Sequence, residues 1–335
     1  MSNRIPTDQD EQARQAKAKL TAHRGMATWG EKLVPLSAFR KAAAESGLKL
    51  APGEREAAVL SYQAGADDPT PVEGPYARVA VFGGLYSNHY ALEALLEDAA
   101  RRGAEAVYCL GDLGGFGPNP EKVRPLLDQG GVLSIQGNYE ESLASGREDC
   151  NCGYTDPRDN HFAEISYRYT ERNSSPGFKA WMGTLPGRRR VLVGDRETLL
   201  VHGSPRRVNE FLFHSTTPVP FLEVLLDQQR CDAVLCTHTG LRWHRRLPSG
   251  RDVVNVGVIG RPANDGHTRV WYSLIEARED GLAVELLPLV YDHQGLAAEM
   301  RSEGLPEEFV ETILTGWWTT CMEILPARER AASRF

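Results

Sequence analysis

Short apolar segments that end at glycine recur through the middle of the chain. They lie at residues 78–84, 106–111, 131–137, 198–203 and 232–238. Segments of this length with few polar residues are typical of strands buried on both faces of a sheet. Segments with helical spacing lie between them, at residues 89–104, 121–129 and 221–229. This alternation predicts an α/β protein.

The pattern changes on both sides of this region. After His238, alternating apolar and polar residues at 241–257, 268–277 and 282–289 predict antiparallel strands, and the spacing from Gln294 to Met322 predicts a helical tail. The first 76 residues are polar and rich in Pro and Gly, with helices expected at 37–46 and 54–62. We therefore expect an N-terminal polar and helical extension (1–76), a central domain (77–290) and a C-terminal helical tail that packs on it (291–335).

Polar residues of metal-ligand type follow four of the predicted strands. Asp112 follows the second strand, Asn138 the third, His202 the fourth and His238 the fifth. If these strands are neighbours in one sheet, their carboxyl ends gather the four side chains at one edge. A carboxylate, an amide oxygen and two imidazoles suit a divalent metal ion such as Mn, Fe, Zn or Ni. Each residue alone would more simply be a turn residue or a structural histidine, and only the repetition favours a site.

Composition limits where the protein acts and what it binds. A net charge of −7 in 335 residues gives no general attraction to nucleic acid or to an anionic membrane. The N-terminus lacks the apolar core of a secretory signal, and no segment is apolar enough to span a membrane. We therefore expect a cytoplasmic protein whose six cysteines are free thiols.

Five motifs, taken in order, resemble the calcineurin-like metallophosphoesterases. They are GDLGGFGPNP (111–120), QGNYEESL (136–143), LLVHGSPR (199–206), CTHTG (236–240) and VVNVGVIGRP (253–262). The similarity is strongest to small bacterial phosphoesterases with a GD-x-x-GYGPNP-type loop. The resemblance implies two sheets flanked by helices, an α/β/β/α sandwich, and two metals bridged by an aspartate. Asp112 matches that aspartate, and Asn138, His202 and His238 match the other ligands of one metal.

The ligands of the other metal are missing. In the family's D-x-H-x-N motif, Gly84 and Tyr86 stand at the Asp and His positions, and Gly240 replaces the second histidine of G-H-x-H. All three losses fall on one metal position, which indicates that the site has been modified rather than destroyed. Loss of the requirement for ligands at a metal position that was already empty would give the same pattern. Tyr139 replaces the histidine that protonates the leaving group in the family, and a phenol with a pKa near 10 suits that role poorly.

Other segments offer candidate replacements for the lost ligands. Cys150, Cys152 and His161 lie in a turn-rich stretch shortly after Tyr139 and would rebuild a second site, or the stretch simply covers the pocket. Asn88 is a further pocket candidate, and Arg206 has the planar donors that bind phosphate.

These observations lead to one main hypothesis and two alternatives. The main hypothesis is a hydrolase of a phosphomonoester or phosphodiester, with Asp112, Asn138, Tyr139 and His202 as candidate catalytic residues and a small phosphorylated molecule as partner. The first alternative is a non-catalytic metal or nucleotide sensor on the same fold. The second is a metalloenzyme of different chemistry built around Cys150 and Cys152. The oligomeric state is left open.

Overall fold

The computed structural model describes residues 26–29, 32–35 and 70–333. The chain divides into two compact units, residues 1–68 with 216–229, and residues 69–215 with 230–335. In the first unit the described residues form an antiparallel hairpin, β1 (Met26–Trp29) with β2 (Lys32–Pro35), and helix α9 (Val219–Gln229). The helices expected at 37–46 and 54–62 lie outside the described residues.

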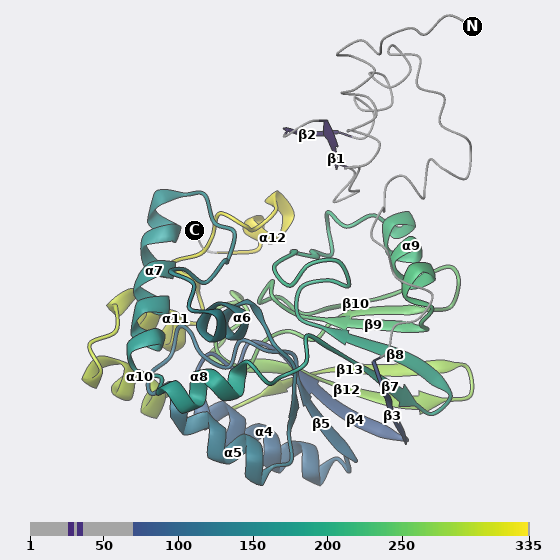
Figure 1. The fold of residues 1–335 in the computed structure, drawn as a ribbon, viewed down its shortest axis with the longest axis horizontal. Coiled ribbons are helices and arrows are strands. Elements are labelled where there is room, and N and C mark those ends of the chain that lie inside the picture. Colours follow the sequence, from purple (N-terminus) through teal and green to yellow (C-terminus); the bar gives the residue numbers. More distant parts are fainter. Residues whose placement is uncertain (1–25, 30–31, 36–69, 334–335) are drawn as a thin grey trace, which may run out of the picture. The chain divides into compact units, whose positions relative to one another are not determined.

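The second unit contains two sheets (Figure 1). The six-stranded sheet has the order β10-β11-β9-β8-β7-β3 and comprises β3 (Val72–Tyr76), β7 (Arg188–Val193), β8 (Arg196–Val201), β9 (Ala233–Cys236), β10 (Trp243–Arg246) and β11 (Asp252–Asn255). The five-stranded sheet has the order β13-β12-β4-β5-β6 and comprises β4 (Arg78–Phe82), β5 (Ala106–Cys109), β6 (Leu133–Ser134), β12 (Val270–Arg278) and β13 (Gly281–Leu289).

Strand β4 shows why its sequence is apolar throughout. Val79 and Val81 belong to a buried cluster shared by both sheets, whereas Ala80 and Phe82 belong to a second cluster that includes helix residues. Side chains alternate between the faces of a strand, so one face of β4 meets the other sheet and the other face meets helices. The expected two-sheet α/β sandwich with flanking helices is thereby confirmed.

Helices of this unit cover the outer face of the five-stranded sheet (Figure 1). They are α4 (His89–Arg101), α5 (Val123–Gln129), preceded by the 3₁₀ turn η1 (Pro120–Lys122), α6 (Asn138–Ser145), α7 (Pro157–Arg172), α8 (Pro176–Met182), α10 (His293–Ser302) and α11 (Glu307–Thr315). The short helix α12 (Ala327–Ala331) has no buried residue and does not belong to this layer. Helix α4 places Leu92 and Leu95 in the core, and the Asn88 side chain caps its N-terminus by accepting from the Ala91 amide.

The structure refines one sequence prediction and corrects another. The helical tail expected from Gln294 to Met322 consists of two helices, α10 and α11, because Gly304 has a positive φ and Pro306 cannot continue a helix. The stretch expected as a turn-rich loop through residue 162 becomes helix α7 at Pro157, where Asp156 caps the helix. In addition, β3 pairs with β7, so residues before the expected boundary at 77 take part in the sheet.

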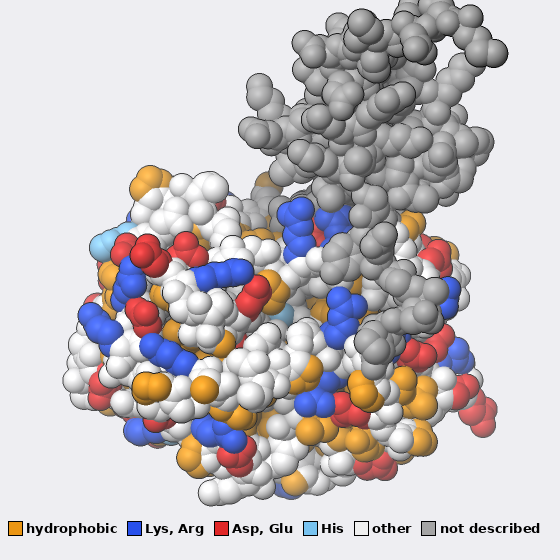
Figure 2. All heavy atoms as spheres, in the orientation of Figure 1, with side chains coloured by type: hydrophobic (Ala, Val, Ile, Leu, Met, Phe, Trp, Pro, Cys, Tyr) orange, Lys and Arg blue, Asp and Glu red, His pale blue; other side chains and the backbone are white. Residues whose placement is uncertain are grey.

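The face of the molecule in Figure 2 carries acidic and basic side chains interspersed among polar and apolar ones. Among the described residues, no helix has the length and apolar character needed to cross a membrane.

Candidate functional site

The four predicted metal ligands come from the ends of strands in both sheets. Asp112 follows β5, and Asn138 begins α6 just after β6, both from the five-stranded sheet. His202 follows β8 and His238 follows β9, both from the six-stranded sheet. The expectation that the four strands belong to one sheet was therefore wrong. The residues meet where the carboxyl ends of strands from the two stacked sheets lie close together.

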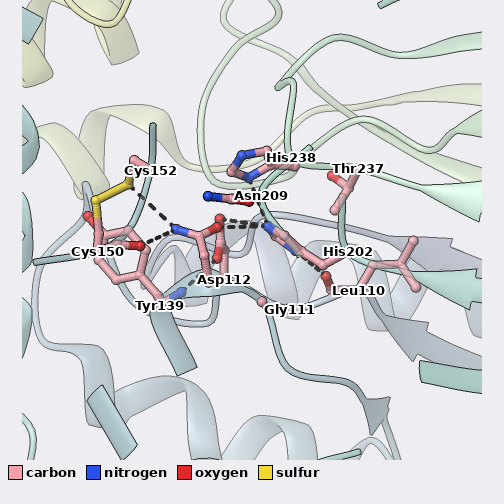
Figure 3. Close-up of polar contacts among 12 residues, drawn as sticks. Leu110, Gly111, Asp112, Tyr139, Cys150, Cys152, His202, Asn209, Thr237 and His238 are labelled. Carbon is pink, nitrogen blue, oxygen red and sulfur yellow. Dashed lines mark hydrogen bonds and ion pairs between the residues drawn. A yellow bond between two sulfur atoms is a disulfide. The ribbon is translucent and has the colours of Figure 1, made fainter. Parts of the chain in front are cut away.

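The side chains of these residues converge on one point. Nε2 of His202 lies 3.1 Å from Oδ1 of Asn138, 3.0 Å from Nδ1 of His238 and 3.3 Å from Oδ2 of Asp112. Figure 3 shows the two imidazole rings turned toward Asp112. Ligands about 2.1 Å from a common tetrahedral centre lie about 3.4 Å apart, so these separations fit a single bound cation.

Hydrogen bonds outside this cluster fix which atoms face its centre. Nδ1 of His202 contacts the Leu110 carbonyl at 2.5 Å, which leaves Nε2 for the site. Nδ2 of Asn138 donates to the Cys150 carbonyl at 2.7 Å, which leaves Oδ1 for the site. Nε2 of His238 is buried and has no hydrogen-bond partner. Bonds of this kind are what orient the ligands of a metal, and the residues present fit a divalent ion.

The electrostatics of the cluster favour an ionised Asp112. Burial opposes its charge, but the adjacent His202 ring holds the pKa of Asp112 below its usual value. Burial likewise disfavours a charged His202, but Asp112 raises the pKa of His202. Burial, together with the neighbouring His202 ring, lowers the pKa of His238 to about 3, so this ring is neutral near pH 7. An ionised carboxylate and a neutral imidazole are the forms that bind metals.

Glu140 holds the Asp112 loop, a role that the sequence interpretation did not give it. Its fully buried carboxylate accepts from the amides of Asp112 and Leu113 at 2.8 Å and from the amide of Gly137 at 2.7 Å. Glu140 stands three residues after the N-cap residue Gly137, and this spacing is the capping-box signal that would have identified its role. Burial raises the pKa of Glu140, with a further contribution from Asp112.

The two loops that supply Asp112 and Asn138 approach each other closely. A Cβ atom at Gly137 would lie 2.4 Å from Oδ1 of Asp112 and 2.8 Å from Cε1 of His202, so only glycine fits there. Asp112 and His238 themselves have positive φ, at 56° and 66°. Strained backbone of this type is concentrated at functional sites.

The cysteine segment, Cys150 to Cys152, lies beside the cluster of four predicted ligands and contacts Asn138. Cys150 and Cys152 form a disulfide, so the expectation that all six cysteines are free thiols was wrong for these two. The expectation rested on chain length and compartment, whereas the Cα atoms of the two residues lie 5.2 Å apart, a separation that a disulfide spans. Sγ of Cys152 lies 3.5 Å from Nδ2 of Asn138, so the disulfide borders the cluster (Figure 3).

The remaining pocket candidates lie apart from the four ligands. His161 is exposed on α7. Asn88 is buried, and its Nδ2 donates to the Ile259 carbonyl at 3.1 Å. Arg206 pairs with Glu210 at 3.0 Å. None of these candidates borders the cavity next to the ligands.

Tyr139 borders that cavity, with its hydroxyl 2.8 Å from Oγ of Ser166. Burial raises its pKa above the ordinary value of a phenol, so Tyr139 stays protonated at every physiological pH and is a poor proton donor. The cavity has a volume of ≈ 60 Å³, and Asp112, Asn138 and His238 line one part of it. Arg261, which sequence reasoning did not single out, lines another part.

Comparisons with known proteins identify the family of the chain. Residues 78–279 match the family model of the calcineurin-like phosphoesterase superfamily domain. An uncharacterized protein of Methanocaldococcus jannaschii is 23% identical over 247 residues, which cover 71% of this chain and 98% of that protein.

Two solved structures share the fold. A metallophosphoesterase from Sphaerobacter thermophilus matches with a TM-score of 0.55 and 24% identity, over 71% of this chain and 98% of that one. A hypothetical protein from Pyrococcus horikoshii matches with a TM-score of 0.59 and 23% identity, over 74% of this chain and all of that one. With a family model that spans more than half of its length, the chain belongs to the calcineurin-like phosphoesterase superfamily.

Proposed function

We propose that this protein is a metal-dependent hydrolase of a phosphomonoester or phosphodiester that works with one firmly held divalent ion. The observation that carries the proposal is the convergence of Asp112, Asn138, His202 and His238 on one buried point beside a cavity. Superfamily membership supplies the reaction class. We expect the protein to act in the cytoplasm on a small phosphorylated molecule.

Each residue of the site has a separate task in this proposal. Asp112 supplies the negative charge that balances the cation, and the Leu110 carbonyl keeps Nε2 of His202 directed at it. Glu140 fixes the backbone on which Asp112 stands. When bound, a divalent ion at this point would polarise a phosphoryl oxygen and lower the pKa of water.

Tyr139 determines which leaving groups we expect the enzyme to release. Because burial raises the pKa of its phenol and its hydroxyl is bonded to Ser166, Tyr139 replaces a proton donor with a group that holds its proton tightly. A leaving group that departs as a stable anion needs no such donor. We therefore expect hydrolysis to depend steeply on the pKa of the leaving group, with aryl esters cleaved much faster than alkyl esters.

The proposal is tested with aryl phosphate mono- and diesters in the presence of Mn²⁺, Zn²⁺, Fe²⁺ or Ni²⁺. We expect turnover that His202→Ala lowers by about a thousandfold or more, because several kcal/mol of charge stabilisation is lost. His244→Ala is the matched control, since His244 lies on β10 and pairs with Asp252. Turnover that survives in His202→Ala would overturn the proposal.

A non-catalytic sensor is the second candidate, favoured by Tyr139 and by the loss of a side chain at Gly84. One bound ion per chain and no turnover of aryl mono- and diesters with any of these metals would favour the sensor. A centre rebuilt from Cys150 and Cys152 has less support, because sulfurs joined in a disulfide are not thiolate ligands.

A further inference from the structure

The places of two missing ligands are occupied by large side chains. A Cβ atom at Gly84 would lie 2.7 Å from Cζ and 2.9 Å from the hydroxyl oxygen of Tyr86. A Cβ atom at Gly240 would lie 2.8 Å from the Trp318 ring and 3.3 Å from Nη2 of Arg261. A ligand side chain at either position would therefore collide with Tyr86, Trp318 or Arg261.

Arg261 is a buried cation without a carboxylate partner. Its side chain is 6% exposed, and its guanidinium carbon lies 3.7 Å from the centre of the Trp318 ring. Among residues 70–333 no Asp or Glu forms an ion pair with it, and its Nε has no hydrogen-bond partner. Burial opposes its charge, but Tyr86, Cys321 and Tyr154 are the titratable groups that favour this charge and raise the pKa of Arg261, and Cys321 also makes a side-chain hydrogen bond to it.

A buried charge of this kind is costly unless something compensates it. Removing a guanidinium from water carries a large desolvation penalty, and one stacked indole offsets only part of it. Arg261 borders the same cavity as Asp112 and His238. A cavity of ≈ 60 Å³ holds about four to six water-sized probes, enough room for a small anion.

We propose that Arg261 is a phosphoryl-binding residue that takes the place of the missing second metal. Its planar donors would hold two oxygens of a tetrahedral phosphate beside the divalent ion that Asp112, Asn138, His202 and His238 would bind. The chain thus replaces one of two cations with a guanidinium fixed by Trp318 and Tyr86. The ligand class is a phosphate monoester dianion or inorganic phosphate, the anions with the most charge to place between two cations.

This inference rests on the proposed function of the same site, but its test does not need turnover. Inorganic phosphate is titrated into metal-loaded protein and followed by calorimetry, with metal content measured in parallel. We expect Arg261→Gln to raise the Kd for phosphate at least about tenfold while the metal content is unchanged. Arg261→Lys keeps the charge but loses the bidentate fork, and we expect a severalfold rise in Kd.

Arg242→Gln is the matched control. Arg242 also stacks on an indole, 3.3 Å from the centre of the Trp271 ring, but it contacts Asp265 and does not border the cavity. Its removal should leave the Kd for phosphate unchanged. If Arg261→Gln does not fold, the Kd for phosphate of Arg261→Lys is compared with that of the wild type, and an unchanged Kd refutes the inference.

The outcomes separate this inference from the proposed function. Phosphate bound through Arg261 without hydrolysis would support the inference and refute the hydrolase. Hydrolysis with a Kd for phosphate that is the same in the wild type, Arg261→Gln and Arg261→Lys would refute the inference and leave the hydrolase standing. No phosphate binding by the metal-loaded wild type would also refute the inference.

Discussion

The two metal positions that the resemblance implies are chemically different regions in this chain. Around His202, lone pairs of oxygen and nitrogen converge, and the second polar atoms of His202 and Asn138 are bonded to backbone carbonyls. Around Gly240, the space is filled by the Trp318 ring and the Arg261 guanidinium. One region is arranged to hold a cation, and the other already contains one.

The space beside Gly84 and Gly240, where the resemblance places the other metal's ligands, is filled by side chains. Protein interiors are close-packed, so an emptied metal position must be refilled by side chains or by water. Tyr86 and Trp318 fill the volume, and Arg261 restores a positive charge that cannot dissociate. If ligands were simply no longer required at this position, their absence would be explained. The buried guanidinium of Arg261 beside Gly240 would not.

The largest effect on stability should come from the region that holds the cation. Glu140→Ala leaves three buried backbone N–H groups without an acceptor, and we expect the free energy of unfolding to fall by about 4 kcal/mol. Urea unfolding of metal-free protein measures it. Glu141→Ala on the same helix is the control, because the Glu141 carboxylate pairs with the half-exposed Arg147 and its loss should change stability by less than about 1 kcal/mol. Equal effects of the two substitutions would show that Glu140 does not anchor the Asp112 loop.

A smaller effect on the free energy of unfolding should come from the region around Gly240, where Trp318 and Arg261 fill the space. Gly240 has φ of 75°, and a Cβ there would lie 2.8 Å from the buried Trp318 ring, so we expect Gly240→Ala to cost about 3 kcal/mol. Gly250→Ala is the control, because Gly250 has φ of 82° and nothing within 4 Å of the added atom. The difference in urea midpoint between the two variants measures the packing around Trp318. If Gly240→Ala is no worse than Gly250→Ala, the space is not filled as described.

The cysteine segment should affect the metal only weakly. Its contact with Asn138 runs mainly through the Cys150 carbonyl, which Cys150→Ser with Cys152→Ser retains. We expect the double variant to bind the same number of ions, with metal affinity lowered by no more than about tenfold. Metal titration with a competing chelator measures this affinity. Loss of an ion in the double variant would instead indicate a centre built from the sulfurs.

The smallest effect is expected away from both metal positions, at Glu299 on α10. Burial opposes its ionisation, but donors from Lys122, Asn119 and Tyr90 lower its pKa overall. A folded-state pKa below the unfolded value means that this stabilisation is complete above about pH 5 and is lost as pH falls below about 4.3.

We therefore expect Glu299→Gln to cost about 1 kcal/mol at pH 7 and less at pH 3, measured by urea unfolding at both values. A cost that is the same at both pH values would show that the charge of Glu299 is not what stabilises the contact. Because this contact is remote from the ligands, the variant should also leave metal content unchanged.

The sequence predicted the features that depend on local pattern. The apolar strands around Val79 and Leu199 and the ligand types that follow each strand were all visible in the chain. The sheet to which each strand belongs was not, because β5 and β8 have similar apolar sequences but lie in different sheets. The helical start at Pro157 was missed, although Asp156 and Pro157 form a capping signal.

Features that depend on distant contacts could not be predicted. Arg261 stands after a glycine in a loop, and only Trp318, 57 residues later in the chain, makes it a buried cation. The anchoring role of Glu140 likewise depends on the amides of Asp112 and Leu113, which belong to another strand end. The domain boundaries at 77 and 291 and the cytoplasmic location remain predictions.

Counting metal ions per chain tests the central claim most directly. Purified protein is loaded with Mn²⁺ or Zn²⁺, freed of excess ion and analysed by inductively coupled plasma mass spectrometry, beside His202→Ala. The account predicts one ion per chain in the wild type and none in His202→Ala. Two ions per chain in the wild type, or one ion that persists in His202→Ala, would contradict it.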